Sequence, residues 1–191
     1  MPTAEQVLLS ALRETARYYG PRGGRAPKGF TRPKSNEAAG WTRAELSFLK
    51  DRLEQAGHVV KREREVENRL PPDLVVVEGD GRITVHLERE TRGFEWNHVL
   101  GALLKMLLLP DPPAEVTFLV IANTEVANSG SGPNLNNVLD LSKKLLQRVR
   151  GVKRLYVAAW CGRSRWDDTR IFRLSSTGRM RDAIKKLRVF P

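Results

Sequence analysis

The clearest alternation of apolar and polar residues lies between positions 70 and 90. Two runs rich in Val and Ile, Leu74 to Val77 and Ile83 to Leu87, flank the pair Asp80-Gly81. An Asp-Gly pair between two such runs is typical of a β-hairpin with a tight two-residue turn. The pattern therefore predicts an antiparallel hairpin whose register is set by Asp80 and Gly81.

This register brings acidic residues together at the open end of the hairpin. The expected opposed pairs are Asp73 with Glu88, Val75 with His86, and Val77 with Thr84. Glu90 follows two residues after Glu88 and therefore shares its face. The other face is purely apolar and should face the core; it carries Leu74, Val76, Ile83, Val85 and Leu87. Because like charges opposite one another destabilise a sheet, we expect a cation, most simply a divalent metal, beside the three acids.

Further helices and strands are predicted on both sides of the hairpin. Helical spacing of apolar residues predicts helices over 3–19, from Thr42 to Gly57, over 94–109, over 135–149 and near 180–188. Further strands are predicted from position 58 and over 115–122, 152–160 and 169–174. We expect one α/β domain over 1–191, with a central mixed β-sheet flanked by helices. It would comprise an N-terminal helix and basic loop (1–41), an αβββαβ core (42–122) and a C-terminal extension (123–191).

Composition narrows the class of protein. The 191 residues are 40% hydrophobic and 29% charged, which fits an ordinary globular chain. The most apolar run is too short to span a bilayer, and the N-terminus lacks the pattern of a signal peptide. The single cysteine, Cys161, excludes an intramolecular disulfide and a multi-cysteine zinc site. We expect a cytoplasmic protein with no membrane association.

The net charge of +11 is unevenly distributed. From Lys143 to the C-terminus there are fifteen Lys and Arg against three Asp. The loop over residues 20–35 has no acid before Glu37, and its cations are Arg22, Arg25, Lys28, Arg32 and Lys34. Such surfaces favour a polyanionic partner such as nucleic acid, although a solvated basic surface is the simpler alternative. The loop is either a mobile connector or an arm that orders on a phosphate backbone.

The hairpin and its neighbours resemble the PD-(D/E)xK nuclease superfamily. Pro72-Asp73 begins the second strand of the core, and Glu88-Arg89-Glu90 ends the third. The resemblance implies a restriction-endonuclease-like core and a Mg²⁺ site, with Mn²⁺ as a substitute. Its ligands would be Asp73, Glu88 and the main-chain carbonyl of Arg89. It also implies an assisting glutamate on the preceding helix, for which Glu45 matches best and Glu37 less well.

One position departs from the family pattern. Glu90 stands where the family usually has lysine, as in some restriction enzymes that resemble this chain in using Glu-x-Glu. Glu90 could act as general base or hold the attacking water. Arg92, Lys61 or Lys105 could then supply the missing positive charge, and the sequence does not choose among them.

The combined pattern predicts a Mg²⁺-dependent endonuclease that acts on DNA. Its catalytic acids would be Asp73, Glu88, Glu90 and Glu45, while His86 and His98 are expected to be structural. The nucleic-acid-binding residues would be Arg22, Arg25, Lys28, Arg32, Lys34, Arg92, Arg163 and Arg165. Two alternatives stay open: a non-catalytic nucleic-acid-binding protein that keeps the fold, and an interaction subunit whose acids meet a basic partner. A homodimer is compatible with any of them.

Overall fold

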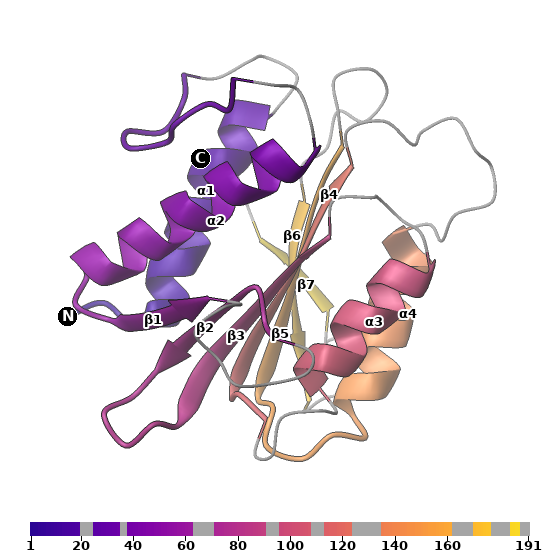
Figure 1. Cartoon of the computed structure of the whole chain (residues 1–191). Helices are drawn as coiled ribbons and strands as arrows, with labels where there is room; N and C mark the ends of the chain where they lie inside the picture. The colour runs from indigo at the N-terminus through magenta and orange to yellow at the C-terminus, as the bar shows by residue number, and fades with distance from the viewer. Residues whose placement is uncertain are drawn as a thin grey trace.

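The computed structural model describes residues 1–19, 25–34, 38–62, 71–90, 96–107, 113–123, 135–161, 170–176 and 184–187. These residues form an α/β fold in which seven strands build one mixed sheet (Figure 1). The helices are α1 (Ala4–Tyr19), α2 (Ala38–Gln55), α3 (Trp96–Leu107) and α4 (Leu135–Leu146). The strands are β1 (Val59–Arg62), β2 (Leu74–Val77), β3 (Ile83–Glu90), β4 (Val116–Asn123), β5 (Arg154–Cys161), β6 (Arg170–Ser175) and β7 (Ile184–Leu187). No helix within these ranges is both long and apolar enough to cross a bilayer.

The strands lie in the sheet in the same order as in the chain. Strands β1, β2 and β3 form an antiparallel meander, and β5, β6 and β7 form another. Between them, β3, β4 and β5 run parallel, with α3 and α4 in the connections. Parallel neighbours need such crossover connections. Their carboxyl ends therefore meet at one end of the sheet, where Glu88 and Glu90 lie on β3.

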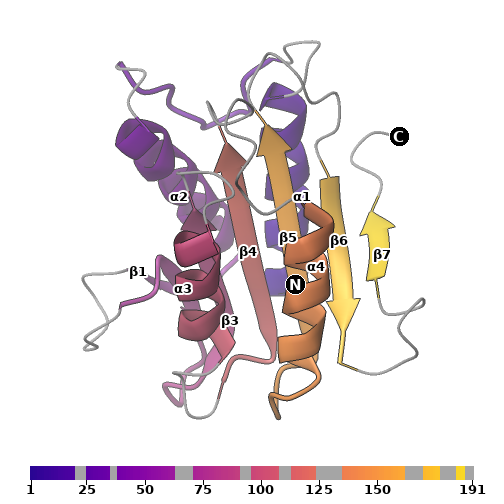
Figure 2. The ribbon, with the colours of Figure 1, turned by 90° about the vertical axis from the view of Figure 1, so that its right-hand side faces the viewer.

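Helices cover both faces of the sheet (Figures 1 and 2). Helices α1 and α2 pack on one face, against a core that includes Leu74, Val76 and Leu87. Helices α3 and α4 pack on the other face, against a core that includes Leu119 and Ile121. Alternate residues of one strand thus reach different cores, because successive side chains point to opposite faces.

The predicted hairpin register is confirmed in the strands, although the turn differs. Leu74 pairs with Leu87, Val75 with His86, and Val76 with Val85. The Gly81 N–H donates to the Glu78 carbonyl at 2.9 Å, and the Glu78 N–H donates to the Arg82 carbonyl at 2.9 Å. The loop therefore contains three residues, with Gly81 at a φ of 87° that glycine adopts without strain.

A bulge next to the turn compensates for the extra loop residue. Val77 pairs with Ile83 rather than with Thr84, and the register shifts between Val76 and Val77. Thr84 is left as the additional residue on β3. The bulge restores the register expected for a two-residue turn, so the predicted pairs hold further along the strands.

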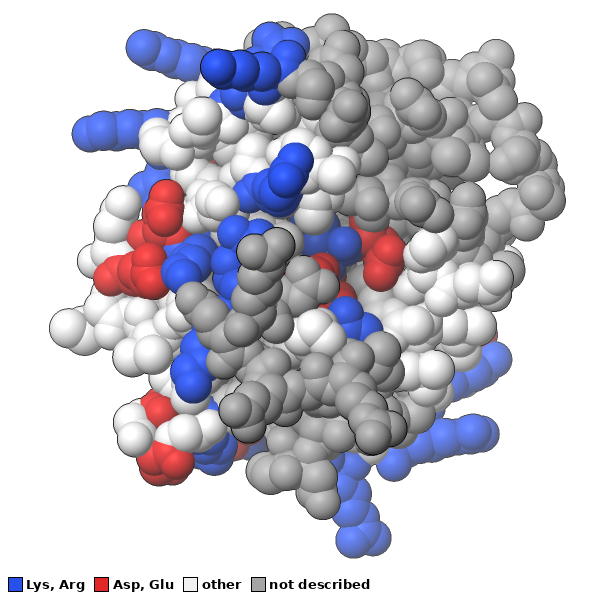
Figure 3. Space-filling model, viewed as in Figure 1, with Lys and Arg blue, Asp and Glu red and all other residues white. Residues whose placement is uncertain are grey.

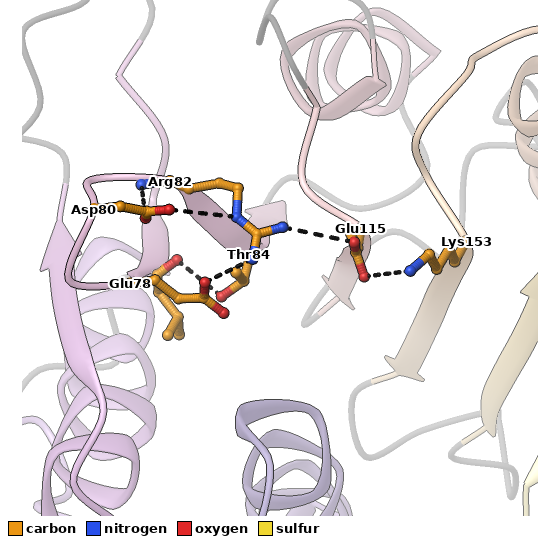
Figure 4. A network of polar contacts seen from close by, with 7 residues as sticks. Glu78, Asp80, Arg82, Thr84, Glu115 and Lys153 are labelled. Atoms are coloured by element: carbon orange, nitrogen blue, oxygen red, sulfur yellow. Dashed lines mark hydrogen bonds and ion pairs between the residues drawn. The ribbon is translucent and has the colours of Figure 1, made fainter.

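An exposed network of charges surrounds this turn (Figure 4). The Arg82 guanidinium lies 2.6 Å from Glu78, 4.0 Å from Asp80 and 3.7 Å from Glu115. Glu115 also accepts from Lys153 at 2.8 Å. These five residues, which we call the tip network, connect the hairpin turn to the beginnings of β4 and β5.

Two predicted elements were wrong in detail. The capping-box form predicted that the second helix begins near Thr42, but α2 begins at Ala38. Thr42 lies inside the helix, and its hydroxyl accepts a hydrogen bond from the Arg89 side chain at 2.5 Å. The final helix predicted near 180–188 is also wrong over 184–187, which form β7. Pairing of β7 with β6 satisfies backbone groups that an open edge would leave unpaired, so tertiary pairing overrides the local helical spacing.

Candidate active site

Asp73 and Glu88 are in contact at the carboxyl end of β3, as the register predicted. The Asp73 N–H donates to Glu88 Oε1 at 3.4 Å, and Asp73 Oδ2 accepts from the Arg89 N–H at 2.7 Å. Glu90 lies two residues further along β3 and is half-buried. We call Asp73, Glu88 and Glu90 the acid cluster. It lies on the face of the sheet that α3 covers, because Lys105 of α3 contacts Glu88 there.

Glu88 is buried and is compensated by two side chains. Only 1% of its side chain is exposed. Lys105 Nζ lies 2.6 Å from Glu88 Oε2, and His86 Nε2 lies 2.7 Å from Oε1. Burial of a carboxylate is costly unless the charge is paired and hydrogen-bonded. Lys105 and His86 therefore offset the cost of burying the Glu88 carboxylate.

The structure selects one of the three candidates for the missing positive charge. Lys105 lies within the acid cluster, whereas Lys61 is exposed on β1, two strands away. Arg92 lies outside the described residues. Partial burial works against the ammonium form of Lys105, but the hydrogen bond to Glu88 and the charges of all three acids raise its pKa overall. Lys105 is therefore a cation at neutral pH.

Glu90 has a perturbed environment of its own. Burial is the main reason that the pKa of Glu90 is raised, and the charges of Asp73 and Glu88 raise it further. His98, whose Nδ1 lies 3.7 Å from Glu90 Oε2, and Lys105 act in the opposite direction. A carboxylate with a raised pKa holds a proton more readily than an ordinary glutamate, which suits a general base.

Glu45 does not join the acid cluster. Arg89 lies between Glu88 and Glu90 in the sequence, so strand alternation directs its side chain to the opposite face of the sheet, which α2 covers. There the Arg89 Nε contacts the Glu45 carboxylate, and both side chains are almost completely buried. Glu45 is thus the partner of the Arg89 side chain rather than a neighbour of Asp73. Glu37, the weaker candidate, lies outside the described residues.

The acid cluster fits a hard divalent cation, although it is not a complete set of ligands. Among the described residues, no group of three or more His, Cys, Asp or Glu side chains is arranged to hold an ion as it stands. Mg²⁺, however, is commonly held by only one or two carboxylates and several waters. Asp73 and Glu88, whose main-chain N–H and side chain are hydrogen-bonded to each other, supply two carboxylates, and the charges of all three acids act on one ammonium. The donor set therefore suits Mg²⁺ or Mn²⁺.

The basic loop is better anchored than its sequence predicted. Phe30 is only 8% exposed and packs against Tyr18, Trp41 and Phe48. Arg32 lies over the Trp41 ring at 5.9 Å. The remaining described cations of the loop, Arg25, Lys28 and Lys34, are exposed. This loop lies at the upper left of Figure 1, and Figure 3 shows Lys and Arg side chains projecting from the same part of the molecule.

Several predicted contact residues cannot be placed. Arg22, Arg163 and Arg165, like Arg92, lie outside the described residues. Sequence reasoning treated Thr42 only as a helix cap, not as a partner of Arg89, and treated His86 only as a structural histidine. The sequence did contain a signal that His86 lies beside Glu88, because a residue two positions before Glu88 on a strand must share its face.

Comparisons of the chain with protein-family models, with curated proteins and with solved structures find no match. The chemistry of the site therefore has to be inferred from its own geometry.

Proposed function

We propose that this protein is a metal-dependent nuclease that hydrolyses phosphodiester bonds in DNA in the cytoplasm. The observation that carries the proposal is the contact between Asp73 and Glu88 beside the Lys105 ammonium. The order of elements from α2 to β4, helix, strand, strand, strand, helix and strand, supports a restriction-endonuclease-like core. The acid cluster lies at the carboxyl ends of parallel strands, where open α/β sheets commonly bind ligands.

Asp73 and Glu88 would hold the metal ion, and the main-chain carbonyl of Arg89 is the third ligand that the resemblance implies. A bound Mg²⁺ polarises the phosphoryl group and lowers the pKa of a bound water. The Arg89 N–H keeps the Asp73 carboxylate in place through its 2.7 Å hydrogen bond. The Asp73 N–H and His86 do the same for Glu88.

Two side chains have roles in the reaction itself. Glu90 would accept a proton from the attacking water, since burial raises its pKa above that of an ordinary glutamate. Lys105 would stabilise negative charge that develops on the phosphoryl oxygens. In this proposal, the ammonium that the family usually places on the strand at the position of Glu90 comes from helix α3 instead.

The anchored basic loop would bind the phosphate backbone. Arg32 lies over Trp41, and the next residue, Thr42, contacts Arg89. The loop is thereby connected to the strand that carries the acid cluster. Neutralised phosphates release counterions, so this surface would add affinity without sequence specificity. The other predicted cations would extend this surface. A homodimer would place two such sites on one duplex, one for each strand.

The test is cleavage of plasmid DNA by the purified protein with Mg²⁺. We expect cleavage that Asp73→Asn and Glu88→Gln abolish while DNA binding is retained. Glu78→Gln, a change of an exposed acid in the tip network, is the matched control and should leave cleavage unchanged. The proposal fails if the metal-loaded protein cuts neither duplex, single-stranded nor branched substrates.

A second candidate is a non-catalytic nucleic-acid-binding protein. It is favoured by the saturation of Glu88, whose two oxygens are already occupied by His86, the Asp73 N–H and Lys105. This candidate predicts binding that weakens with salt and no cleavage under any metal. Affinity for nucleic acid that does not change with salt would exclude both candidates.

A further inference from the structure

His86 is a buried histidine whose polar contact is with the acid cluster. It is 3% exposed, shares the face of β3 with Glu88, and lies opposite the buried Val75. Its Nε2 lies 2.7 Å from Glu88 Oε1. Its Nδ1 is buried and has no hydrogen-bond partner in the part of the chain that the structure describes. Because an ionised carboxylate only accepts, Nε2 carries the hydrogen and donates it.

The two oxygens of Glu88 have different kinds of partner. Oε1 accepts from the His86 ring and from the Asp73 N–H at 3.4 Å, and both donors belong to the β2–β3 hairpin. Oε2 contacts Lys105, a long side chain that is 22% exposed. A lysine stem can withdraw toward solvent, whereas a buried ring and a main-chain amide cannot. A metal ion that displaces the Lys105 ammonium would therefore meet Oε2 only.

We propose that His86 is a positioning residue that restricts Glu88 to coordination through one oxygen and thereby makes the site prefer Mg²⁺ to Ca²⁺. This inference rests on the proposed function, because it assumes that the acid cluster holds a divalent ion. Mg²⁺ requires near-octahedral geometry and keeps several waters, which suits carboxylates that bind through one oxygen. Ca²⁺ takes six to eight oxygens and is often bound by both oxygens of one carboxylate.

His86 is not itself a ligand in this arrangement. Its Nε2 donates a hydrogen to Glu88 and so offers no lone pair to a metal. Its effect is on the rotation of the Glu88 carboxylate. Without the ring donor, only the longer hydrogen bond from the Asp73 N–H, at 3.4 Å, holds Oε1. Glu88 can then turn both oxygens toward a larger ion, and the discrimination between Mg²⁺ and Ca²⁺ weakens.

The test is calorimetric titration of the full chain with Mg²⁺ and, separately, with Ca²⁺, in the absence of nucleic acid. His86→Phe removes the donor and keeps a ring, whereas His86→Gln keeps an amide N–H at a similar reach. In His86→Phe we expect the Mg²⁺ affinity to fall about 10- to 100-fold, as is usual when a partner of a metal ligand is removed. The Ca²⁺ affinity should fall less or rise, and His86→Gln should restore most of the discrimination.

A change at another histidine supplies the control. His58, whose Nε2 lies 3.1 Å from the Pro2 carbonyl, contacts none of the three acids, and His58→Gln should leave both affinities unchanged. If His86→Phe does not fold, His86→Leu provides a second variant without the donor. The inference would be overturned if the variant without the His86 donor still prefers Mg²⁺ to Ca²⁺ to the same extent, or if it loses affinity equally for both ions.

The outcomes separate this inference from the proposed function. A protein that binds Mg²⁺ with the expected dependence on His86, but cleaves no nucleic acid, supports the inference and removes the nuclease proposal. A protein that cleaves with Mg²⁺, but prefers Mg²⁺ to Ca²⁺ equally with and without the His86 donor, removes the inference alone. A protein that binds neither ion removes both.

Discussion

The acid cluster and the tip network lie at opposite ends of the same hairpin, and in both places acids lie beside Lys or Arg side chains. In the tip network every carboxylate lies within 4.0 Å of a Lys or Arg nitrogen, and the side chains are 41% to 66% exposed. In the acid cluster Glu88 is 1% exposed, and three acids share the Lys105 ammonium. The two ends therefore differ in burial and in the balance of charge.

This difference separates a structural cluster from a candidate site. An exposed ion pair changes the free energy of unfolding little, because water solvates each separated charge almost as well as the pair does. Buried acids in excess of their cations are costly and are kept only where the fold holds them in place. A further cation would lower that cost at the acid cluster, where three acids face one ammonium, whereas the tip network sets two cations against three solvated acids. We expect the following changes to test how burial and charge balance distinguish these clusters, in order of decreasing effect.

The largest effect on the free energy of unfolding is expected at the most buried ion pair discussed above, Arg89 and Glu45. Arg89→Leu leaves the Glu45 carboxylate buried without its partner and should lower the free energy of unfolding by about 3–5 kcal/mol. The double variant Glu45→Leu/Arg89→Leu should recover most of this loss. Denaturant unfolding measures both, with the exposed Arg43→Leu as control. If the double variant folds and cleaves DNA, Glu45 is not a catalytic acid. If it folds but does not cleave DNA, the assignment of Glu45 as nothing more than the partner of Arg89 is contradicted.

The next effect compares two lysines, one at each end of the hairpin. Lys105→Met leaves Glu88 buried without its ammonium and should cost about 2–3 kcal/mol in the metal-free protein. Lys153→Met, in the tip network, should cost less than about 1 kcal/mol. Added Mg²⁺ should raise the melting temperature of Lys105→Met more than that of the unmodified protein, because the ion no longer competes with the ammonium. Similar losses in the two variants would mean that burial does not distinguish the two ends.

The smallest expected effect is on the free energy of unfolding when Glu90 or Glu115 is replaced by Gln, and the two changes should have opposite signs. It is measured by unfolding the metal-free protein at a series of pH values. Burial raises the pKa of Glu90, so its ionisation destabilises the folded state as pH rises from the ordinary glutamate pKa through the raised value. Glu90→Gln should therefore stabilise the protein above that range and have no effect below it. The pKa of Glu115 is lowered, chiefly by its hydrogen bond to Lys153, so its contribution is present at neutral pH and is lost as pH falls through the lowered value.

Glu115→Gln should accordingly destabilise the protein slightly at neutral pH, by less than about 1 kcal/mol, and have no effect in acid. The two variants thus shift stability in opposite directions at neutral pH. Shifts of the same sign would contradict the assignment of the acid cluster as the end with excess negative charge.

Period-two alternation and the Asp-Gly signal were enough to predict how β2 and β3 pair. The contact between Asp73 and Glu88 followed from that pairing, because opposed residues of an antiparallel pair share a face. The prediction even survived a wrong turn length, since the bulge at Thr84 offsets the extra loop residue. Local spacing was less reliable where pairing with another strand competes with a helix, as at β7.

What the sequence alone determined about this protein is therefore a hairpin with one apolar face and acids gathered at its open end. Only the tertiary structure decided which cation neutralises those acids and that Glu45 is not among them. Lys105 reaches Glu88 from α3, and Glu45 is held by Arg89 on the other side of the sheet. Strand alternation specifies which face a residue occupies. Which helix packs there, and which of its residues faces the strand, depends on packing between segments that are distant along the chain.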